Sequence, residues 1–405
     1  MNNLTIFGRE IIDENCIQQM ENCLTEGDVG VLTADAHYGY GHPIGGVAAY
    51  ENKISLSGVG FDIACGNKAV KTNIKKYEVN IPKLMDAIFT EIGFGLGRPN
   101  PDKIDHEVFD KIAHADFKPQ RNLLQTARNQ LGTVGGGNHF IDVFEDLEDG
   151  YLWVGVHFGS RGFGHKTATG FIAMSEGGNF EDHGKEKPMD SPPIVFDVDS
   201  GLGQDYIAAM ELAGEYAYAG RDAVVSKVLK LMGAKSRFEV HNHHNFAWRE
   251  QHQGKDYWVV RKGCTPAFPG QTGFVGSTMS DISVVIEGVD SELSRKGLYS
   301  TVHGAGRVIS RRKAAGKTKW MANPNGIGKK LVVTQPGIVD FKAVKKQMKE
   351  AKIELRGAGA DEAPECYKKL EEVLGYHDGT IKILHRLKPL GVAMAGLDVF
   401  DPYKD

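Results

Sequence analysis

The segment His303-Gly304-Ala305-Gly306-Arg307 is the most informative stretch of this 405-residue chain. It places an imidazole beside three small residues, and an arginine follows directly. Small residues leave open space around the ring and free amides beside it, so a bulky phosphate could approach its nitrogens. A histidine in this setting is a candidate nucleophile. The alternative for the segment taken alone is a turn histidine without a chemical role.

Four segments upstream combine a carboxylate, a thiol or imidazoles with glycine or amide neighbours. They are Asp62-Ile63-Ala64-Cys65, Gly135-Gly136-Gly137-Asn138-His139, His157-Phe158-Gly159-Ser160-Arg161-Gly162 and His241-Asn242-His243-His244-Asn245. A thiolate can bridge two divalent ions while a carboxylate serves one of them, and glycine-rich loops expose amides to phosphate oxygens. Each segment alone also fits a buried structural cysteine or histidine. All five segments together predict a dinuclear metal site of a phosphotransferase or of a hydrolase.

Three histidines crowd into four residues at His241, His243 and His244. In an extended chain His241 and His243 point to one face, and His244 points to the other. The spacing does not decide which of these rings binds a metal, so the choice stays open at the level of the residues.

Composition limits the class of protein. The hydrophobic share of 41% and the charged share of 25% are typical of a globular protein. A net charge of −4 carries no overall nucleic-acid signature, so any contact with a nucleic acid would depend on local basic patches. The best patch is 307–319, with Arg311, Arg312, Lys313, Lys317 and Lys319.

The cysteines bear on the cellular compartment. Five widely spaced cysteines, an odd number, do not fit a disulfide framework and favour a reducing compartment. We find no basic and apolar leader and no apolar run as long as a membrane span. We therefore expect a cytoplasmic protein without a membrane segment.

Periodicity predicts a mixed α/β protein without repeats or an interdomain linker, so we expect one domain over residues 1–405. Alternation predicts strands at 29–36, 47–56, 151–157, 237–240 and 257–260. Helical spacing predicts helices within 105–131, 204–232, 342–355 and 364–374. Long loops are expected near 176–203 and 263–277. The candidate residues then lie at strand ends and on glycine-rich loops, where a rigid scaffold presents chemistry.

The chain resembles the RtcB family of RNA-splicing ligases over nearly its whole length. The resemblance begins at Asp35-Ala36-His37-Tyr38-Gly39-Tyr40-Gly41 and Pro43-Ile44-Gly45-Gly46, and ends at Lys388-Pro389-Leu390-Gly391-Val392. Between them stand Asp-x-x-Cys, Gly-Asn-His-Phe, His-x-Gly-Ser-Arg-Gly, His-His-Asn, Arg-Lys-Gly-x-Thr and His-Gly-Ala-Gly-Arg, in an order that is highly specific. The resemblance implies a single α/β domain with central sheets around a deep cleft for two Mn²⁺ ions.

The resemblance also assigns roles to residues. It implies that Asp62, Cys65 and His139 hold one ion, and that Cys65, His157 and His244 hold the other. His303 would attack the α-phosphate of GTP and carry GMP. The product would be RNA in which a 3′-phosphate or 2′,3′-cyclic phosphate end is joined to a 5′-hydroxyl end, in RNA repair or tRNA splicing. The implied nucleotide contacts are Asn138, Asp142, Asn245, Gly276, Ser277, Ser283, Gly304, Ala305 and Gly306, and the implied RNA phosphate contacts are Arg161 and Arg307.

The chain departs from the family pattern around the nucleotide. Asp142 stands where the family usually has Glu, and Val275-Gly276-Ser277-Thr278 replaces Pro-Gly-Ser-Met. Ala395 stands at about the position of a lysine that contacts guanine in the family. Loss of a charge-assisted contact costs about 1.5–3 kcal/mol of affinity, so we expect either compensation by Lys388 or a lysine of the tail, or a relaxed nucleotide preference.

Two alternatives follow from the same residues. One is a dinuclear metal phosphoesterase that only opens cyclic phosphate ends, and the other is a non-catalytic RNA-end-binding protein. For the ligase we expect a monomer that works with or without an archease-like activator.

Overall fold

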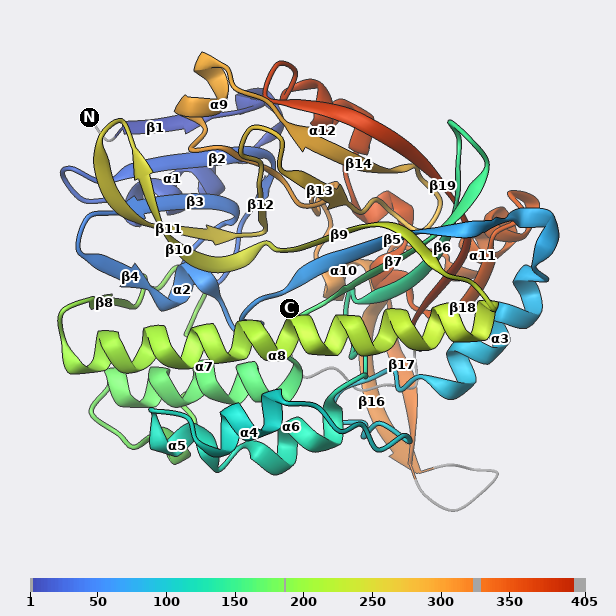
Figure 1. Ribbon diagram of the computed structural model, residues 1–405, viewed down its shortest axis with the longest axis horizontal. Coiled ribbons are helices and arrows are strands. Elements are labelled where there is room, and N and C mark those ends of the chain that lie inside the picture. Colours follow the sequence, from blue (N-terminus) through green and yellow to red (C-terminus); the bar gives the residue numbers. More distant parts are fainter. Residues whose placement is uncertain (1–2, 186, 323–328, 397–405) are drawn as a thin grey trace.

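Two β-sheets form the centre of the fold (Figure 1), and the segment that begins at His303 follows β15 (Ser300–Val302) of a separate two-stranded ribbon. The computed structural model describes residues 3–185, 187–322 and 329–396. The first sheet has the order β1-β2-β3-β11-β10 and consists of β1 (Asn3–Ile6), β2 (Val29–His37), β3 (Ile44–Tyr50), β11 (Lys255–Lys262) and β10 (Asn245–His252).

The second sheet has eight strands, and β19 is the longest of them. Its order is β13-β14-β19-β6-β7-β5-β9, with β18 added parallel to β19. The strands are β13 (Thr272–Val275), β14 (Ser283–Gly288), β19 (Ile381–Gly396), β6 (Phe140–Asp146), β7 (Tyr151–Phe158), β5 (Gly66–Lys75), β9 (Ser236–His243) and β18 (Glu354–Ala358). The first sheet packs against this one through a shared core, to which Val31 and Val47 contribute from one side and Val284 and Ile286 from the other.

Three two-stranded ribbons and the helices complete the fold. The ribbons are β4 (Lys53–Ser55) with β8 (Val195–Asp197), β12 (Cys264–Pro266) with β15 (Ser300–Val302), and β16 (Gly316–Ala322) with β17 (Lys329–Pro336). The helices are α1 (Glu14–Asn22), α2 (Leu56–Val59), α3 (Ile81–Glu91), α4 (Val108–Ala113), α5 (Lys118–Arg121), α6 (Leu124–Gln130), α7 (Arg161–Ser175), α8 (Gly201–Met232), α9 (Glu292–Lys296), α10 (Arg311–Ala315), α11 (Phe341–Glu350) and α12 (Leu370–Gly375).

Helix α8 packs against both sheets. The Ser200 hydroxyl accepts a hydrogen bond from the Gly203 amide at its start, and Gly233, at a φ of 66°, ends it. Its 32 residues span about 48 Å. The first half packs with Phe246 of β10, and the second half packs with the eight-stranded sheet. In Figure 1 the helix runs along one side of the two sheets, with α7 beside it.

The structure confirms the mixed α/β class and corrects several expected elements. The expected strand 47–56 is two strands, because β3 ends at Tyr50 and Ser55 caps α2 by accepting a hydrogen bond from the Gly58 amide. The expected helical stretch 105–131 is divided into α4, α5 and α6, and Pro119 stands at the start of α5.

The loop and C-terminal expectations also change. Residues 263–277 contain the short strands β12 and β13, so this segment is not one continuous loop. The expected helix 342–355 ends at Glu350, because Lys352 takes a φ of 58° and the chain then enters β18. Only Leu370–Gly375 of the expected helix 364–374 is α-helical.

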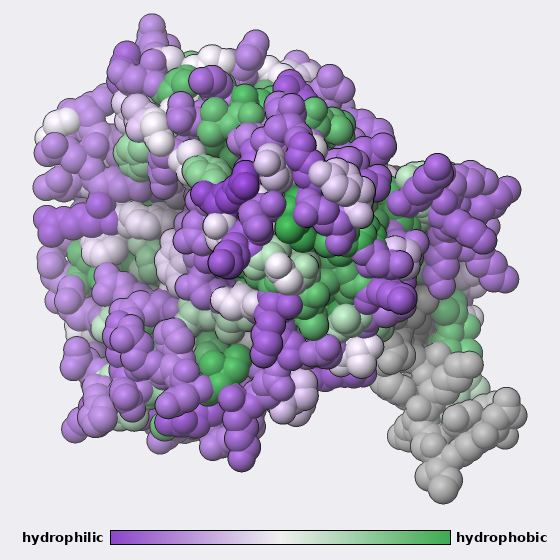
Figure 2. Space-filling model, turned by 45° about the vertical axis from the view of Figure 1, so that its right-hand side comes forward, coloured by the Kyte–Doolittle hydropathy of each residue, from purple (hydrophilic) through white to green (hydrophobic). Residues whose placement is uncertain are grey.

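The surface is mainly polar on the side that Figure 2 displays, and its hydrophobic residues gather near the middle of that view. Among the described residues, no helix combines the length and the apolar character that a bilayer crossing requires. All five cysteines are buried and free.

Candidate active site

Strand register brings Cys65, His139 and His157 together at one edge of the eight-stranded sheet. His157 on β7 pairs with Phe140 on one side and with Asn67 on the other. His139 and Cys65 directly precede the strands that contain these partners. The Cys65 Sγ lies 3.3 Å from His157 Nε2 and 3.7 Å from His139 Nε2, and the ligand atoms of the three residues lie within 4.8 Å of one another.

Asp62 adds a carboxylate to this group. Its Oδ2 lies 3.0 Å from His139 Nε2. The other ring nitrogen of His139, Nδ1, lies 3.0 Å from the Val134 carbonyl, so Nδ1 carries the proton and Nε2 presents a lone pair. A lone pair facing a carboxylate at this distance requires a positive charge between them, either a proton or a metal ion. A side chain at Gly159 would clash with Asp62, which explains the glycine.

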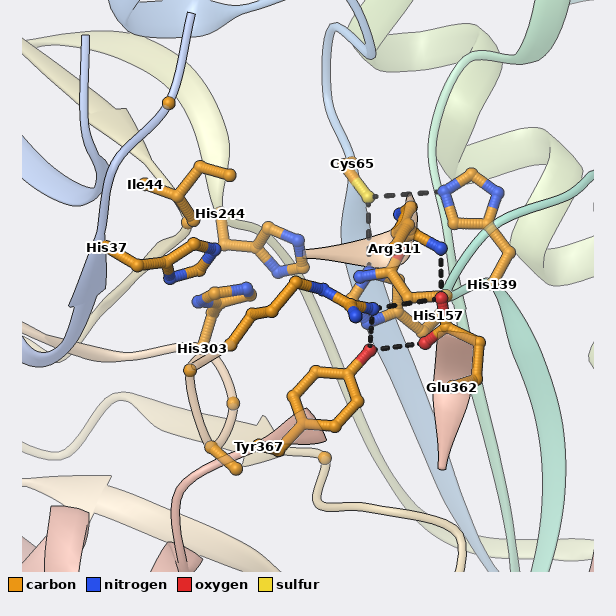
Figure 3. A pocket seen from close by; sticks show the side chains of 18 of the residues that line it. His37, Ile44, Cys65, His139, His157, His244, His303, Arg311, Glu362 and Tyr367 are labelled. Atoms are coloured by element: carbon orange, nitrogen blue, oxygen red, sulfur yellow. Dashed lines mark hydrogen bonds and ion pairs between the residues drawn. The ribbon is translucent and has the colours of Figure 1, made fainter. Parts of the chain in front are cut away.

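His244 faces the same group from the turn between β9 and β10. Its amide donates to the Cys65 carbonyl at 2.8 Å, and the Ala64 amide donates to the Asn245 carbonyl at 2.8 Å. The centre of its ring lies 4.9 Å from that of His157 and 4.8 Å from that of His303. Figure 3 shows His244 between His303 and the Cys65 group.

The other two histidines of the cluster point away from the pocket, as the alternation predicts. His241 and His243 both contact Arg221 of α8, at 2.9 Å each. Burial, followed by the nearby Arg221 charge, lowers the pKa of both rings. Both rings are therefore neutral acceptors.

His303 is held by a buried carboxylate. Asp35 has no exposed surface, and its Oδ2 lies 2.7 Å from His303 Nδ1. The same oxygen accepts the amides of His303 and Gly304 at 3.1 and 3.3 Å, so the Gly304 amide, which was expected to be free, is already used. Burial would raise the pKa of Asp35, but the His303 charge and hydrogen bonds from His303 and Thr33 lower it to about 2. Because Asp35 Oδ2 accepts at Nδ1, the neutral form of the His303 ring has its proton on Nδ1 and presents the lone pair of Nε2.

The donor set fits a divalent metal. It offers a carboxylate oxygen, a thiol and imidazole nitrogens, a mixture that several transition metals accept. Burial lowers the pKa of His157 and of His244 well below the usual range, so both rings are neutral and have lone pairs to donate. Burial and the Asp62 charge raise the pKa of Cys65, so a bound cation would supply the drive to form the thiolate.

A cavity of about 500 Å³ extends from these residues. Its lining includes Asn138, Asp142, Asn245, Gly276, Ser277 and the 304–306 loop. Buried oxygens of Asp142, Ser277 and Thr278 have no hydrogen-bond partner. Burial raises the pKa of Asp142 well above its usual range. Polar atoms without partners at the wall of a cavity are typical of a ligand site.

Two expected nucleotide residues lie outside the lining. Ser283 is buried behind the loop, where its hydroxyl accepts the Ser277 amide at 3.0 Å. Ala395 packs with the hydrophobic core on the face of the sheet that α3 and α8 cover, while Val392 and Met394 of the same strand line the cavity. The alternation of β19 therefore turns position 395 away from the cavity.

The expected phosphate arginines are differently engaged. Arg161 is buried and contacts His139 at 3.4 Å, and it does not line the cavity. Arg307 lines the cavity, but its Nη atoms donate to the Ile309 and Asp361 carbonyls, to Glu362 and to Tyr367. The guanidinium of Arg307 thereby anchors the loop that follows His303.

No site role was predicted from the sequence for Asp35, Glu362 and Tyr367, and Arg311 was expected only as part of a basic patch. Arg311 lines the cavity and forms an ion pair with Glu362, which also accepts from Tyr367. Figure 3 places Arg311 beside the cysteine and histidine group. Asp35 lies in the motif 35–41, so the motif was the available signal for it. No local pattern marks Glu362 or Tyr367.

Fold and site together define a mixed α/β protein whose cavity joins a metal-ligating donor set to a histidine oriented by a buried carboxylate. A model of the tRNA-splicing ligase RtcB family matches residues 23–395. The chain therefore belongs to the RtcB family.

Alignments with individual relatives cover most of this chain and most of each relative. The chain is 29% identical to the tRNA-splicing ligase RtcB of Archaeoglobus fulgidus, in an alignment that covers 95% of this chain and 92% of that protein. It is 30% identical to RNA-splicing ligase RtcB homolog 1 of Entamoeba dispar, with 93% and 81% covered. It is 28% identical to the RNA-splicing ligase RtcB of Escherichia coli K12, with 87% of each chain covered.

Proposed function

We propose that the protein is a GTP- and Mn²⁺-dependent RNA ligase. It joins RNA 3′-phosphate or 2′,3′-cyclic phosphate ends to 5′-hydroxyl ends through a histidine–GMP intermediate, in RNA repair or tRNA splicing. The observation that carries the proposal is the Asp35–His303 pair beside the Cys65, His157 and His244 donor set. Membership of a family whose curated relatives are named RNA-splicing ligases supports it.

The first step uses the lone pair of His303 Nε2. It attacks the α-phosphorus of GTP, a nitrogen–phosphorus bond forms, and the bond to the pyrophosphate oxygen breaks. The proton on Nδ1 stays in place, because Asp35 accepts it in a hydrogen bond of 2.7 Å. The ring becomes positively charged as it attacks, and the adjacent carboxylate offsets that charge.

The base lies against Asp142, Ser277 and Thr278, whose buried oxygens lack partners. Burial by itself favours the protonated form of Asp142, but two N–H donors at the N1 and N2 edge of guanine would favour its carboxylate, which can accept both hydrogen bonds. Because position 395 faces away from the cavity, recognition of guanine rests mainly on the contact between Asp142 and the N1 and N2 edge of the base.

Asp62, Cys65 and His139 would hold one Mn²⁺ ion, and Cys65, His157 and His244 the second, with Cys65 shared. When bound, the ions neutralise charge on the reacting phosphate. The carbonyl bond at His139 Nδ1 and the backbone bonds between the Cys65 and His244 segments prearrange these ligands.

The RNA ends react in two further steps. An oxygen of the 3′-phosphate attacks the phosphorus of His303–GMP and the nitrogen–phosphorus bond breaks, which returns the lone pair to Nε2. The 5′-hydroxyl then attacks the 3′-phosphorus, and GMP leaves. A cyclic phosphate end is opened before these steps. Arg311, held at the cavity by Glu362, is a candidate contact for RNA phosphates beside Arg307, which also lines the cavity.

The test is incubation with GTP labelled at the α-phosphate and with Mn²⁺, followed by a denaturing gel. Wild type is compared with His303→Ala, and ATP is tried in parallel. A labelled band in wild type that is missing from His303→Ala supports the proposal. Absence of a band with either nucleotide contradicts the intermediate and leaves a phosphoesterase or an RNA-end-binding protein.

A second assay separates those alternatives. RNA with a 2′,3′-cyclic phosphate end and RNA with a 5′-hydroxyl end are supplied together with GTP. A joined product is expected from the ligase. Opened ends without joining would indicate the phosphoesterase, and unchanged ends that remain bound would indicate the end-binding protein.

A further inference from the structure

Arg221 of α8 lies behind the candidate metal site, on the side opposite the cavity. Its side chain has no exposed surface. Arg221 Nη1 donates to the Ala64 carbonyl at 3.0 Å and to the Phe158 carbonyl at 2.7 Å. Nε contacts His241 Nε2 and Nη2 contacts His243 Nδ1, both at 2.9 Å.

These acceptors belong to three segments that are far apart in the sequence, and each segment carries a metal-ligand candidate. Ala64 precedes Cys65, Phe158 follows His157, and His243 precedes His244. A single guanidinium therefore links the three segments that present the thiol and two of the imidazoles, through two backbone carbonyls and two histidine side chains. The packing around it is tight, since a side chain at Gly66 would collide with the Asn242 carbonyl and approach Arg221 Nη1.

We propose that Arg221 is a positioning residue that sets the relative placement of Cys65, His157 and His244, and so the metal affinity of the site. The proposal rests on the metal-binding part of the proposed function. It also explains the crowded histidine segment, in which His244 faces the cavity while His241 and His243 serve as acceptors for Arg221.

The rings of His241 and His243 also have contacts other than those with Arg221, and these contacts hold the rings in place. The ring of Tyr218 lies 4.3 Å from His241 and 4.0 Å from His243, measured between ring centres. The His241 Nδ1 lies 3.4 Å from Asp222. A proton on Nδ1 directed at that carboxylate leaves Nε2 as the acceptor for Arg221. A chain of contacts thus connects the Asp222 carboxylate, through His241 and Arg221, to the backbone carbonyls of Ala64 and Phe158.

Lysine cannot replace this arginine. Its ammonium is a single point with three donors, whereas the guanidinium fans five N–H groups in one plane toward separated acceptors. Arg221→Lys therefore leaves part of the acceptors unpaired and frees the three segments to shift. Loss of a group that orients metal ligands typically weakens metal binding about 10–100-fold.

Titration of the full-length, metal-free protein with Co²⁺ tests the proposal. Co²⁺ bound to a thiolate has an absorption band that reports the sulfur ligand, and its weaker visible bands report coordination geometry. For Arg221→Lys we expect Co²⁺ binding about 10–100-fold weaker than in wild type, with altered visible bands. The matched control is Arg261→Lys, because Arg261 is equally buried and donates to Glu250, Ser300 and the Leu298 carbonyl. That variant should lose stability and keep the wild-type Co²⁺ affinity and spectrum.

A second pair of variants decides the matter if Arg221→Lys does not fold. His241→Leu removes one acceptor of Arg221, and His241→Gln restores one through its amide oxygen. We expect weaker Co²⁺ binding in His241→Leu and recovery in His241→Gln. Wild-type affinity and spectrum in Arg221→Lys, or in His241→Leu where that variant decides, would overturn the proposal. Absence of the thiolate band in wild type would instead overturn the metal site of the proposed function.

Discussion

Replacing Asp35 should separate the orientation of His303 from its charge compensation. Three N–H groups converge on Asp35 Oδ2: the ring Nδ1–H of His303 and the backbone amides of His303 and Gly304. In Asp35→Asn the side-chain oxygen should take the place of Oδ2, because the backbone N–H groups of His303 and Gly304 can only donate and therefore require an acceptor there. The side-chain NH₂ group then faces the Thr33 hydroxyl, which lies 2.6 Å from the other carboxylate oxygen and can accept a hydrogen bond.

The expected magnitudes follow from these contacts. A charge-assisted bond contributes about 1.5–3 kcal/mol and a neutral one about 0.5–1.5 kcal/mol, so Asp35→Asn should lower the rate of His303 guanylylation about tenfold. Asp35→Ala removes the acceptor, frees the choice of tautomer and leaves two partly buried amides unpaired. We expect at least about a hundredfold loss of rate and a destabilisation of about 1–3 kcal/mol for each unpaired amide.

Single-turnover labelling with α-labelled GTP measures the rates, and denaturant unfolding measures stability. The reasoning is refuted if Asp35→Ala guanylylates as fast as wild type. It is also refuted if Asp35→Asn is folded and yet as slow as Asp35→Ala, because the oxygen that holds Nδ1 would then make no difference.

Three shorter predictions concern the metal, the nucleotide and acid. Cys65→Ser should abolish the thiolate band of bound Co²⁺ and weaken Mn²⁺ binding measured by calorimetry, since Cys65 is the one sulfur in the donor set; an unchanged band would contradict that assignment. Ala395→Lys should leave the KM for GTP unchanged while Met394→Lys changes it, because only Met394 lines the cavity; a lower KM in Ala395→Lys would show that position 395 reaches the base. The pKa of Asp35 is lowered from 3.8 to about 2 in the folded protein, so about 2 kcal/mol of stability is present above about pH 4 and is lost as the pH falls through about 2; unfolding curves of wild type and Asp35→Asn should converge over that range.

The helix α8 and the strand β7 could be predicted from local sequence patterns, whereas other elements could not. Apolar spacing predicted α8 within a few residues of its bounds, and alternation predicted β7. The divided helices near 105–131 and the split strand at 47–56 depend on single capping and proline positions, which periodicity averages away. The strands β12 and β13 are short, and their partners β15 and β14 lie further along the chain, so they carry almost no local signal.

The sequence by itself determined the chemical content of the site: a carboxylate, a thiol, several imidazoles and glycine-rich turns. It also determined that His244 points opposite to His241 and His243, because alternation is a local property of an extended chain. These features depend on residue type and on neighbours within a few positions.

Only the tertiary structure decided which groups meet. Asp35 reaches His303 across 268 residues, and Arg221 reaches the Ala64 carbonyl across 157. Arg307 likewise donates hydrogen bonds to Glu362 and Tyr367, which lie 55 and 60 residues further along the chain. Such pairs form when separate elements pack against each other, and spacing along the chain does not encode that packing. The residues that bear chemistry could therefore be read from the sequence, whereas the residues that orient them became evident in the fold.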